Sequence, residues 1–428
     1  MHWASWKAQR VFHRRTRAPH HQEAPLISAH HRRWLLAVCL CIAACDGRAP
    51  GDHDAAPNAP TSPATPTLPP VASLDNGVWL KGDLHIHSRH STDSSNNPES
   101  KIIALGESVG MDYLAISDHD NHVGGDVANN TWADPEFRSN ALLLLYSAEF
   151  TTARGHANPF SATPYNHQRL YDARDGLDTA LAKIIKEEGL HFSANHPNGA
   201  DHFGYSYDLV DSIEVWNSAI WSSNAGSMLI WQDMLNSGRN ITARGGSDSH
   251  HGYPGIGDTP GQNSLQAGAN NVGTPTTWVY ATARTSEAVI AALTNGRVSI
   301  SSNPNAPRVV LYADRDRDGT MDMMMGDNAA PPGSAVDFRV DLVGVGVALL
   351  PYTVTVIKNG STLGTYTMQP TSPSLRFTDT PAAGERSYYR VQVEGQPAPY
   401  PQVPASSLLS ANMIALSNPI YFNFNRPR

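Results

Sequence analysis

The chain has 428 residues, of which 40% are hydrophobic and 16% are charged, so its composition is that of a globular protein with a large apolar core. The formal net charge is −8, yet the first 33 residues hold seven Lys and Arg against one Glu, which leaves 24 basic and 38 acidic residues for the remainder. An acidic remainder argues against nucleic acid as a partner, because phosphate binding requires a basic surface. All three cysteines lie between positions 39 and 45, which excludes disulfides and thiolate-bound metals from the rest of the chain.

The N-terminal 45 residues have the layout of an export signal. Arg32 and Arg33 precede the apolar stretch 34–44, which is too short to span a bilayer as a stable helix. The sequence Ile-Ala-Ala-Cys at 42–45 resembles the bacterial lipoprotein box, in which the cysteine carries lipid; a plain signal peptide is the alternative. We therefore expect Cys45 to be lipidated and to anchor the exported protein to a membrane. The anchored protein would face the periplasm or the cell exterior.

Residues 46–75 are rich in Pro, Ala and Thr, which predicts an extended linker. From residue 76 to 305, strand-like and helix-like segments alternate. Strands are expected at 79–84, 112–116, 141–146, 191–195, 212–216, 241–243 and 276–280, and helices at 99–109, 177–188, 227–236 and 286–294. This alternation favours an α/β fold with a largely parallel sheet, closed into a distorted TIM-like (β/α)7 barrel.

A change of pattern at residue 306 indicates a second domain. Segments 309–312, 336–342, 352–358 and 388–393 alternate apolar and polar residues between Gly and Pro turns. We expect residues 306–428 to form a small all-β, sandwich-like domain.

Potential metal ligands follow most of the expected barrel strands. They are His85, His87, Asp93, Asp118, His119, Glu149, His156, His196, Asp248 and His250. The loops after parallel barrel strands converge on one face, so these side chains are expected to meet there. In a His-x-His pair both imidazoles point to the same side of the strand, and a carboxylate such as Glu149 can bridge two ions. The nitrogen and oxygen donors favour Zn, Mn or Fe ions.

These motifs resemble those of the polymerase and histidinol phosphatase (PHP) superfamily of metallohydrolases. The resemblance rests on Gly-Asp-Leu-His-Ile-His-Ser at 82–88, Ile-Ser-Asp-His at 116–119, Ala-Glu-Phe at 148–150, Asn-His-Pro at 195–197 and Gly-Ser-Asp-Ser-His at 246–250. Further segments at 149–158, 213–217 and 418–421 are similar to the branch named after bacterial carbaryl hydrolases. The resemblance implies the ligand set above, with Asp118 either binding metal or orienting His119. Because the family's Ser-Asp-Gly is replaced by Ser-Thr-Asp-Ser at 91–94, His90 is an alternative ligand to Asp93.

The leading hypothesis is a metal-dependent hydrolase that uses metal-activated water on a small-molecule substrate. His196 or His250 is the candidate acid for the leaving group, while Arg154, Trp216 and Asn217 are candidates for the substrate pocket. Phosphoesters are the first expectation. A carbamate, carboxylic ester or amide substrate is the alternative, and a non-catalytic metal-binding surface lipoprotein is a second one.

An acidic turn in the C-terminal region resembles the front half of a calcium-binding loop. It contains Asp314, Asp316, Asp318 and Asp322, with a glycine at position 319. The loop lacks the final Glu, so the expectation is a calcium site or, alternatively, a polar turn.

Overall fold

The computed structural model describes residues 74, 77–198, 202–250, 272–345, 350–398, 400 and 412–424. All of these residues belong to one compact unit. The expected signal segment, Cys45 and the expected linker at 46–75 lie outside the described residues except for Leu74, so their predictions stay predictions.

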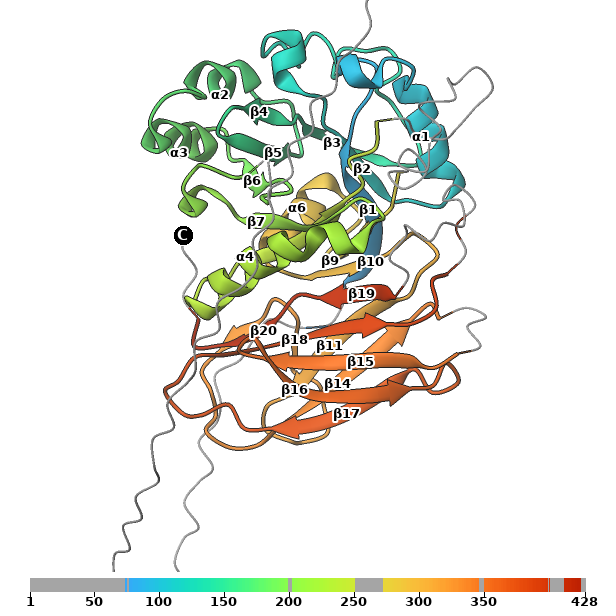
Figure 1. The fold of residues 1–428 in the computed structure, drawn as a ribbon, viewed down its shortest axis with the longest axis vertical. Helices are drawn as coiled ribbons and strands as arrows, with labels where there is room; N and C mark the ends of the chain where they lie inside the picture. Colours follow the sequence, from blue (N-terminus) through green and yellow to red (C-terminus); the bar gives the residue numbers. More distant parts are fainter. Residues whose placement is uncertain are drawn as a thin grey trace, which may run out of the picture. The chain divides into compact units, whose positions relative to one another are not determined.

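A long mixed sheet organises the first part of the compact unit (Figure 1). Its neighbouring strands are, in order, β1 (Val78–Ile86), β2 (Tyr113–Ile116), β3 (Leu143–Ser147), β5 (Gly155–Ser161), β6 (His191–Ala194), β7 (Ser212–Asn217) and β8 (Thr242–Gly246). Pairing is parallel from β1 to β3 and from β6 to β8, whereas β5 runs antiparallel to both of its neighbours. A short strand, β4 (Phe150–Thr152), forms a hairpin with β5.

The segment after β8 returns to β1. The amide of His87 donates to the carbonyl of Ser249 over 2.8 Å, and the amide of Asp248 donates to the carbonyl of His85 over 2.8 Å. The ends of β1 and β8 therefore lie together, as the convergence of ligands requires. The expected (β/α)7 barrel is not confirmed in its detail, because β5 and the strands β9 (Thr276–Ala281) and β10 (Val298–Ser301) pair antiparallel.

The helices follow the strands as the alternation predicts. They are α1 (Glu99–Ser108), α2 (His167–Ala173), α3 (Asp178–Glu187), α4 (Ala225–Asn236) and α6 (Ser286–Thr294). In α3, Leu181, Ile184 and Ile185 recur at helical spacing and are buried against the sheet, which explains why this polar segment folds as a surface helix. The sequence missed α2 and the β4–β5 hairpin, since both are short and lack clear apolar periodicity.

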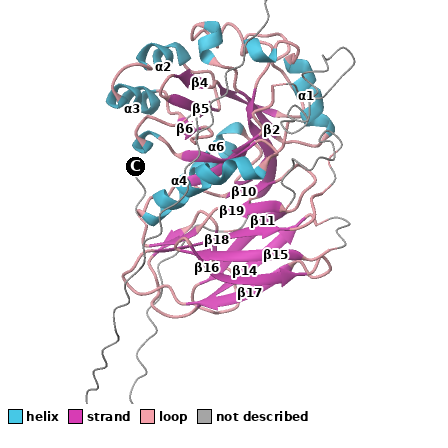
Figure 2. Ribbon diagram, viewed as in Figure 1, coloured by secondary structure: helices cyan, strands magenta, loops and turns pink. Residues whose placement is uncertain are grey.

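The C-terminal region is rich in strands, and no helix follows α6 among the residues that the structure describes (Figure 2). The strands β12 (Met323–Met324), β11 (Arg308–Asp314), β14 (Val336–Val343) and β17 (Ser374–Asp379) form a separate sheet. Five others lie in the long sheet: β15 (Tyr352–Lys358), β16 (Ser361–Met368), β18 (Ser387–Glu394), β19 (Met413–Ser417) and β20 (Ile420–Phe422). The short β13 (Asn328–Ala329) pairs with β20. Both sheets contribute to one buried cluster, with Phe338 and Phe377 from the first and Val391 and Phe422 from the second.

The C-terminal strands continue the first sheet rather than forming a detached body. Strand β19 pairs antiparallel with β10. Buried Asn418 accepts a hydrogen bond from the amide of Ala243 over 2.7 Å and donates to the carbonyls of Ala243 and Val298 over 2.8 and 3.0 Å. A side chain near the end of the chain thus satisfies backbone groups of β8 and β10. The boundary expected at 305/306 stays a prediction.

Among the described helices, none combines the length and apolar content that crossing a lipid bilayer demands.

Candidate metal centre

The first two imidazoles come from the end of β1. His85 and His87 are two residues apart on an extended strand, so their rings lie on the same side, with centroids 5.2 Å apart. Leu84 and Ile86, which alternate with them, are buried in hydrophobic clusters. Both imidazoles are completely buried. The strand therefore presents a pair of ligands from a rigid, well-packed support.

Glu149 lies at the centre of the cluster. Its Oε1 is 3.2 Å from His85 Nε2, and its Oε2 is 2.8 Å from His119 Nδ1. Oε1 is also 3.2 Å from His156 Nδ1 and 3.1 Å from His196 Nε2. The β4–β5 hairpin brings His156 to this carboxylate, because Thr151 and His156 are directly paired across it. One carboxylate thus faces imidazoles from four separate parts of the chain.

The segment after β8 supplies the next ligands. Asp248 Oδ1 is 3.1 Å from His87 Nε2 and 3.4 Å from His85 Nε2. Asp248 has a φ of 53°, which an Asp adopts at some cost, and such conformations concentrate at functional sites. This backbone conformation aims the carboxylate at the His-x-His pair.

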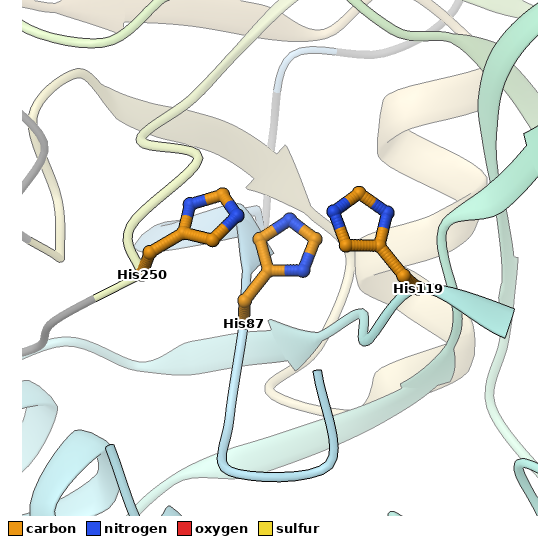
Figure 3. A group of neighbouring side chains, drawn as sticks. All are labelled: His87, His119 and His250. Atoms are coloured by element: carbon orange, nitrogen blue, oxygen red, sulfur yellow. The ribbon is translucent and has the colours of Figure 1, made fainter. Parts of the chain in front are cut away.

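His87, His119 and His250 form a row of neighbouring rings (Figure 3). The ring centroid of His87 lies 4.4 Å from that of His119 and 4.1 Å from that of His250. Asp93 completes this side, since its Oδ2 is 3.4 Å from His119 Nε2 and 3.5 Å from His250 Nε2. His90 instead contacts Asp134 and lies in a different group, so the geometry of this cluster favours Asp93 over His90.

Sequence reasoning did not predict the supporting role of a buried pair, Glu214 and Arg244. Glu214 Oε1 is 3.1 Å from His85 Nδ1 and accepts a hydrogen bond from Arg244 Nη1 over 2.8 Å, and both side chains are fully buried. Glu214 Oε2 also accepts from the amide of His196 over 2.9 Å. Glu214 shares a candidate ligand group with His85 and His196. A Glu between the apolar residues Ile213 and Val215 of a strand was the available signal.

The carboxylate of Asp118 forms its hydrogen bonds with serine, threonine and backbone groups. It accepts hydrogen bonds from the amide and hydroxyl of Ser88, and from the hydroxyls of Ser91 and Thr131, over 2.6–2.9 Å. Ser91 Oγ also accepts from the amide of His119 over 3.0 Å and lies 3.1 Å from His87 Nδ1. These hydrogen bonds tie Asp118 to the ligand-bearing loops, and its role, as a ligand or in orienting His119, stays a prediction.

The three expected pocket residues lie in different environments. Asn217 contacts the cluster, because its Nδ2 donates to Asp248 Oδ2 over 3.2 Å. Trp216 is 1% exposed in the hydrophobic core, with its ring against Trp221 at 4.8 Å, so core packing rather than a pocket wall describes it. Arg154 forms a partly exposed ion pair with Asp178 over 2.7 Å and stacks on Tyr205. The structure gives Arg154 no contact with the cluster.

The electrostatics couple the imidazoles to the carboxylates. Burial alone would lower the pKa of His119, but Glu149 and Asp93 outweigh it and raise the pKa to about 10. The pKa of His196 rises to about 9 because Glu149, Asp248 and Glu214 together outweigh burial. The pKa of His87 falls to about 4, since it is buried beside His250 and His119. Without a cation, the carboxylates thus hold protons on His119 and His196, whereas burial and the neighbouring imidazoles exclude a proton from His87.

The donor set fits divalent metals. His85 Nε2, His87 Nε2 and Glu149 Oε2 are buried and form no hydrogen bond within the described parts of the chain, although they face one another across the cluster. Buried polar atoms are normally satisfied, and these unsatisfied atoms converge on shared positions. Overlapping groups of three donors include His85, His87 and Asp248, and also His87, His119 and His250, which share His87. Shared donors of this kind suit adjacent ions.

Two further histidines, His122 and His251, stand near the ligands in the sequence but are not among the expected ligands. The ring of His122 lies 4.7 Å from that of His119, and its Nδ1 accepts from the amide of Thr92 over 3.1 Å. His251, which follows the last ligand, lies outside the described residues.

The acidic turn after β11 uses its carboxylates in local hydrogen bonds. Asp314 accepts from the amides of Arg317 and Gly319, over 2.7 and 2.9 Å, and Asp318 accepts from the amide of Thr320 over 2.7 Å. Burial raises the pKa of Asp322, and nearby Asp316 and Asp314 add to that rise. The calcium site stays a prediction.

The fold and the site together define a mixed α/β protein with a long central sheet, a β-rich C-terminal region and His, Asp and Glu groups suited to divalent metals. No family model matches the chain, and no curated protein matches it. Among solved structures, it is similar to a two-domain protein from Bacteroides vulgatus described as containing a predicted PHP-like metal-dependent phosphoesterase. The two chains are 16% identical, with 78% of this chain and 95% of the other covered at a TM-score of 0.39, too low to indicate a shared fold.

Proposed function

We propose that the protein is a hydrolase that depends on two or three divalent metal ions of the Zn, Mn or Fe type. The central observation is the convergence of His85, His119, His156 and His196 on the single buried carboxylate of Glu149, at 2.8–3.2 Å. The buried Nε2 atoms of His85 and His87 form no hydrogen bond among the described residues, although carboxylate oxygens of Glu149 and Asp248 lie 3.1–3.5 Å from them, an arrangement that suits ligands of a shared metal. When bound, such ions supply an activated water and stabilise developing negative charge.

The ligands would be His85, His87, Asp93, His119, Glu149, His156, His196, Asp248 and His250, with Glu214 behind His85. Glu214 fixes the orientation of the His85 ring through Nδ1 and leaves Nε2 directed into the cluster. Asn217 holds Asp248 Oδ2 and fixes that carboxylate. His196 and His250 are partly exposed, so either can also reach a substrate and protonate its leaving group.

The order of these ligands along the chain supports membership of the PHP superfamily, within the branch named after carbaryl hydrolases. Phosphoesters are the first substrate class on that basis. A carbamate, carboxylic ester or amide is the second candidate, and one observation favours it. Arg244 is fully buried behind the cluster, and its guanidinium is paired with the carboxylate of Glu214. It therefore offers no positive charge to a phosphate dianion.

Release of p-nitrophenol from a phosphomonoester, a phosphodiester and an aryl carbamate, with Zn- or Mn-loaded protein, tests the proposal. Turnover should be lost in His85→Ala/His87→Ala and retained in His191→Gln, a buried imidazole in β6 that bonds Thr294 and Ser212 instead of the cluster. The preferred compound decides between phosphorus and carbonyl chemistry. Metal-loaded protein without turnover on any of the three would favour the non-catalytic metal-binding lipoprotein.

Export and anchoring at Cys45 form a separate proposal, supported by the sequence of residues 32–45. Cys45→Ser should abolish metabolic labelling with a fatty acid and release the protein from membranes. Calcium binding at Asp314, Asp316, Asp318 and Asp322 is likewise supported by spacing. Asp316→Asn should lower the affinity for Ca²⁺ in calorimetry without changing the hydrolytic site.

A further inference from the structure

A second group of potential ligands lies outside the central cluster. It consists of His90, in the loop after β1, Glu99, the first residue of α1, and Asp134. One ligand atom from each lies within 4.8 Å of the others. His90 Nε2 is 2.8 Å from Asp134 Oδ2 and 3.8 Å from Glu99 Oε1. None of the three contributes to the cluster around Glu149.

The unusual member is Glu99. Its side chain is 0% exposed, and neither carboxylate oxygen forms a hydrogen bond with any part of the chain that the structure describes. A buried charged carboxylate is costly unless it is paired. Protonation would remove the charge but would leave an unpaired O–H and an unpaired carbonyl, so a proton alone does not satisfy this group.

The surroundings of Glu99 are negative. Burial raises its pKa to about 9, and the nearby charges of Asp118, Asp134 and Glu136 add to the rise, while Arg89 opposes it. Arg89 cannot neutralise Glu99 directly, since its guanidinium donates to Asp134 over 2.7 Å and to Glu136 over 3.3 Å. Within the described parts of the chain, His90, at 3.8 Å, is thus the one potential cation within ion-pair distance of Glu99.

We propose that His90, Glu99 and Asp134 bind a separate divalent cation of the Zn or Mn type. One imidazole nitrogen and two carboxylates form a donor set that these ions accept and that Ca²⁺ disfavours. The His90 side chain is 20% exposed while Asp134 and Glu99 are 3% and 0% exposed, so the ion enters from the His90 side. Asp134 is already fixed by the amide of Glu136 and by Arg89, which positions its carboxylate before the ion arrives.

The site would join the β1–α1 loop, which carries His87 and Asp93, to the loop after β2. The ion would fix the segment that bears those ligands. It would be bound in addition to the hydrolytic metals. The inference does not depend on the proposed reaction, because it concerns metal binding alone.

Zinc stoichiometry provides the test. Full-length protein, Glu99→Gln and the control Glu107→Gln, an exposed residue of the same helix, are equilibrated with the same concentration of ZnCl₂ and analysed by mass spectrometry for metal per chain. We expect one zinc fewer per chain in Glu99→Gln and no loss in Glu107→Gln. Calorimetry in buffers of different ionisation enthalpy should show that the lost site releases protons on binding, since Glu99 gives up its proton to the metal.

Equal zinc counts in Glu99→Gln and in the unmodified protein would overturn the proposal, as would an equal loss in both variants, which would indicate nonspecific surface binding. Should Glu99→Gln fail to fold by circular dichroism, His90→Gln replaces it, because His90 is partly exposed. The same single-zinc loss is expected from that variant, and an unchanged count there would refute the site.

Discussion

Replacement of Arg244 by methionine tests the support beneath the candidate metal centre. Arg244 is fully buried and donates from Nη1 to Glu214 over 2.8 Å and from Nε to Ser193 over 2.6 Å; it also bonds Asn195. Methionine fills much of the volume but leaves the Glu214 carboxylate buried without its cation. Removing one partner of a buried ion pair costs about 3–5 kcal/mol in unfolding free energy.

The assay is urea-induced unfolding followed by tryptophan fluorescence, in EDTA so that metal binding does not add to stability. The control is Arg154→Met, which breaks the partly exposed pair with Asp178 and a contact with Tyr205, at a cost of about 1–2 kcal/mol at most. Adding Glu214→Gln to Arg244→Met should recover part of the lost stability, because the unpaired charge is removed as well.

An Arg244→Met protein no less stable than Arg154→Met would refute the reasoning. So would a double variant that is less stable than Arg244→Met alone. In either case the Glu214 carboxylate would have to be compensated by His85 without help from Arg244.

Four further outcomes are expected. Glu149→Gln should reduce the metal bound per chain, measured by elemental analysis, and lower the rate of p-nitrophenol release at least about 100-fold. The reason is that substitution of residues that merely orient metal ligands already lowers metal affinity or activity by about 10–100-fold. In metal-free protein, the raised pKa values of His119 and His196, about 10 and 9, stabilise the fold fully below the unfolded value near 6.5. That stability is lost as pH rises through 9 and 10, so urea midpoints should fall there in EDTA, and a flat profile would contradict the coupling to Glu149. Asn418→Ala should cost about 2–4 kcal/mol in unfolding free energy, because it leaves a β8 amide unpaired. Deletion of 307–428 should prevent folding, as observed by circular dichroism, because β19 pairs with β10. A folded deletion product would show that β19 is dispensable.

Much of the local structure could be predicted from the sequence because its signals are local. Apolar runs placed β1, β2, β6, β7 and β9 within one or two residues of their observed bounds, and α6 coincides with the expected 286–294. The His-x-His pair could be assigned to one face, since side chains on a strand alternate. The chemistry of the donors, imidazole and carboxylate without thiolate, also followed from residue types alone.

Only the tertiary structure decided how distant segments meet. The antiparallel β4–β5 hairpin, which brings His156 to Glu149, has no periodicity that a single sequence reveals. The hydrogen-bond partners of Asp118, which are Ser88 and Ser91, and that of Glu214, which is Arg244, are 27–30 positions away in the chain. Trp216 and Asn217 are neighbours in sequence, yet the alternation along β7 buries one in the core and brings the other to Asp248, because a strand exposes successive side chains to opposite sides.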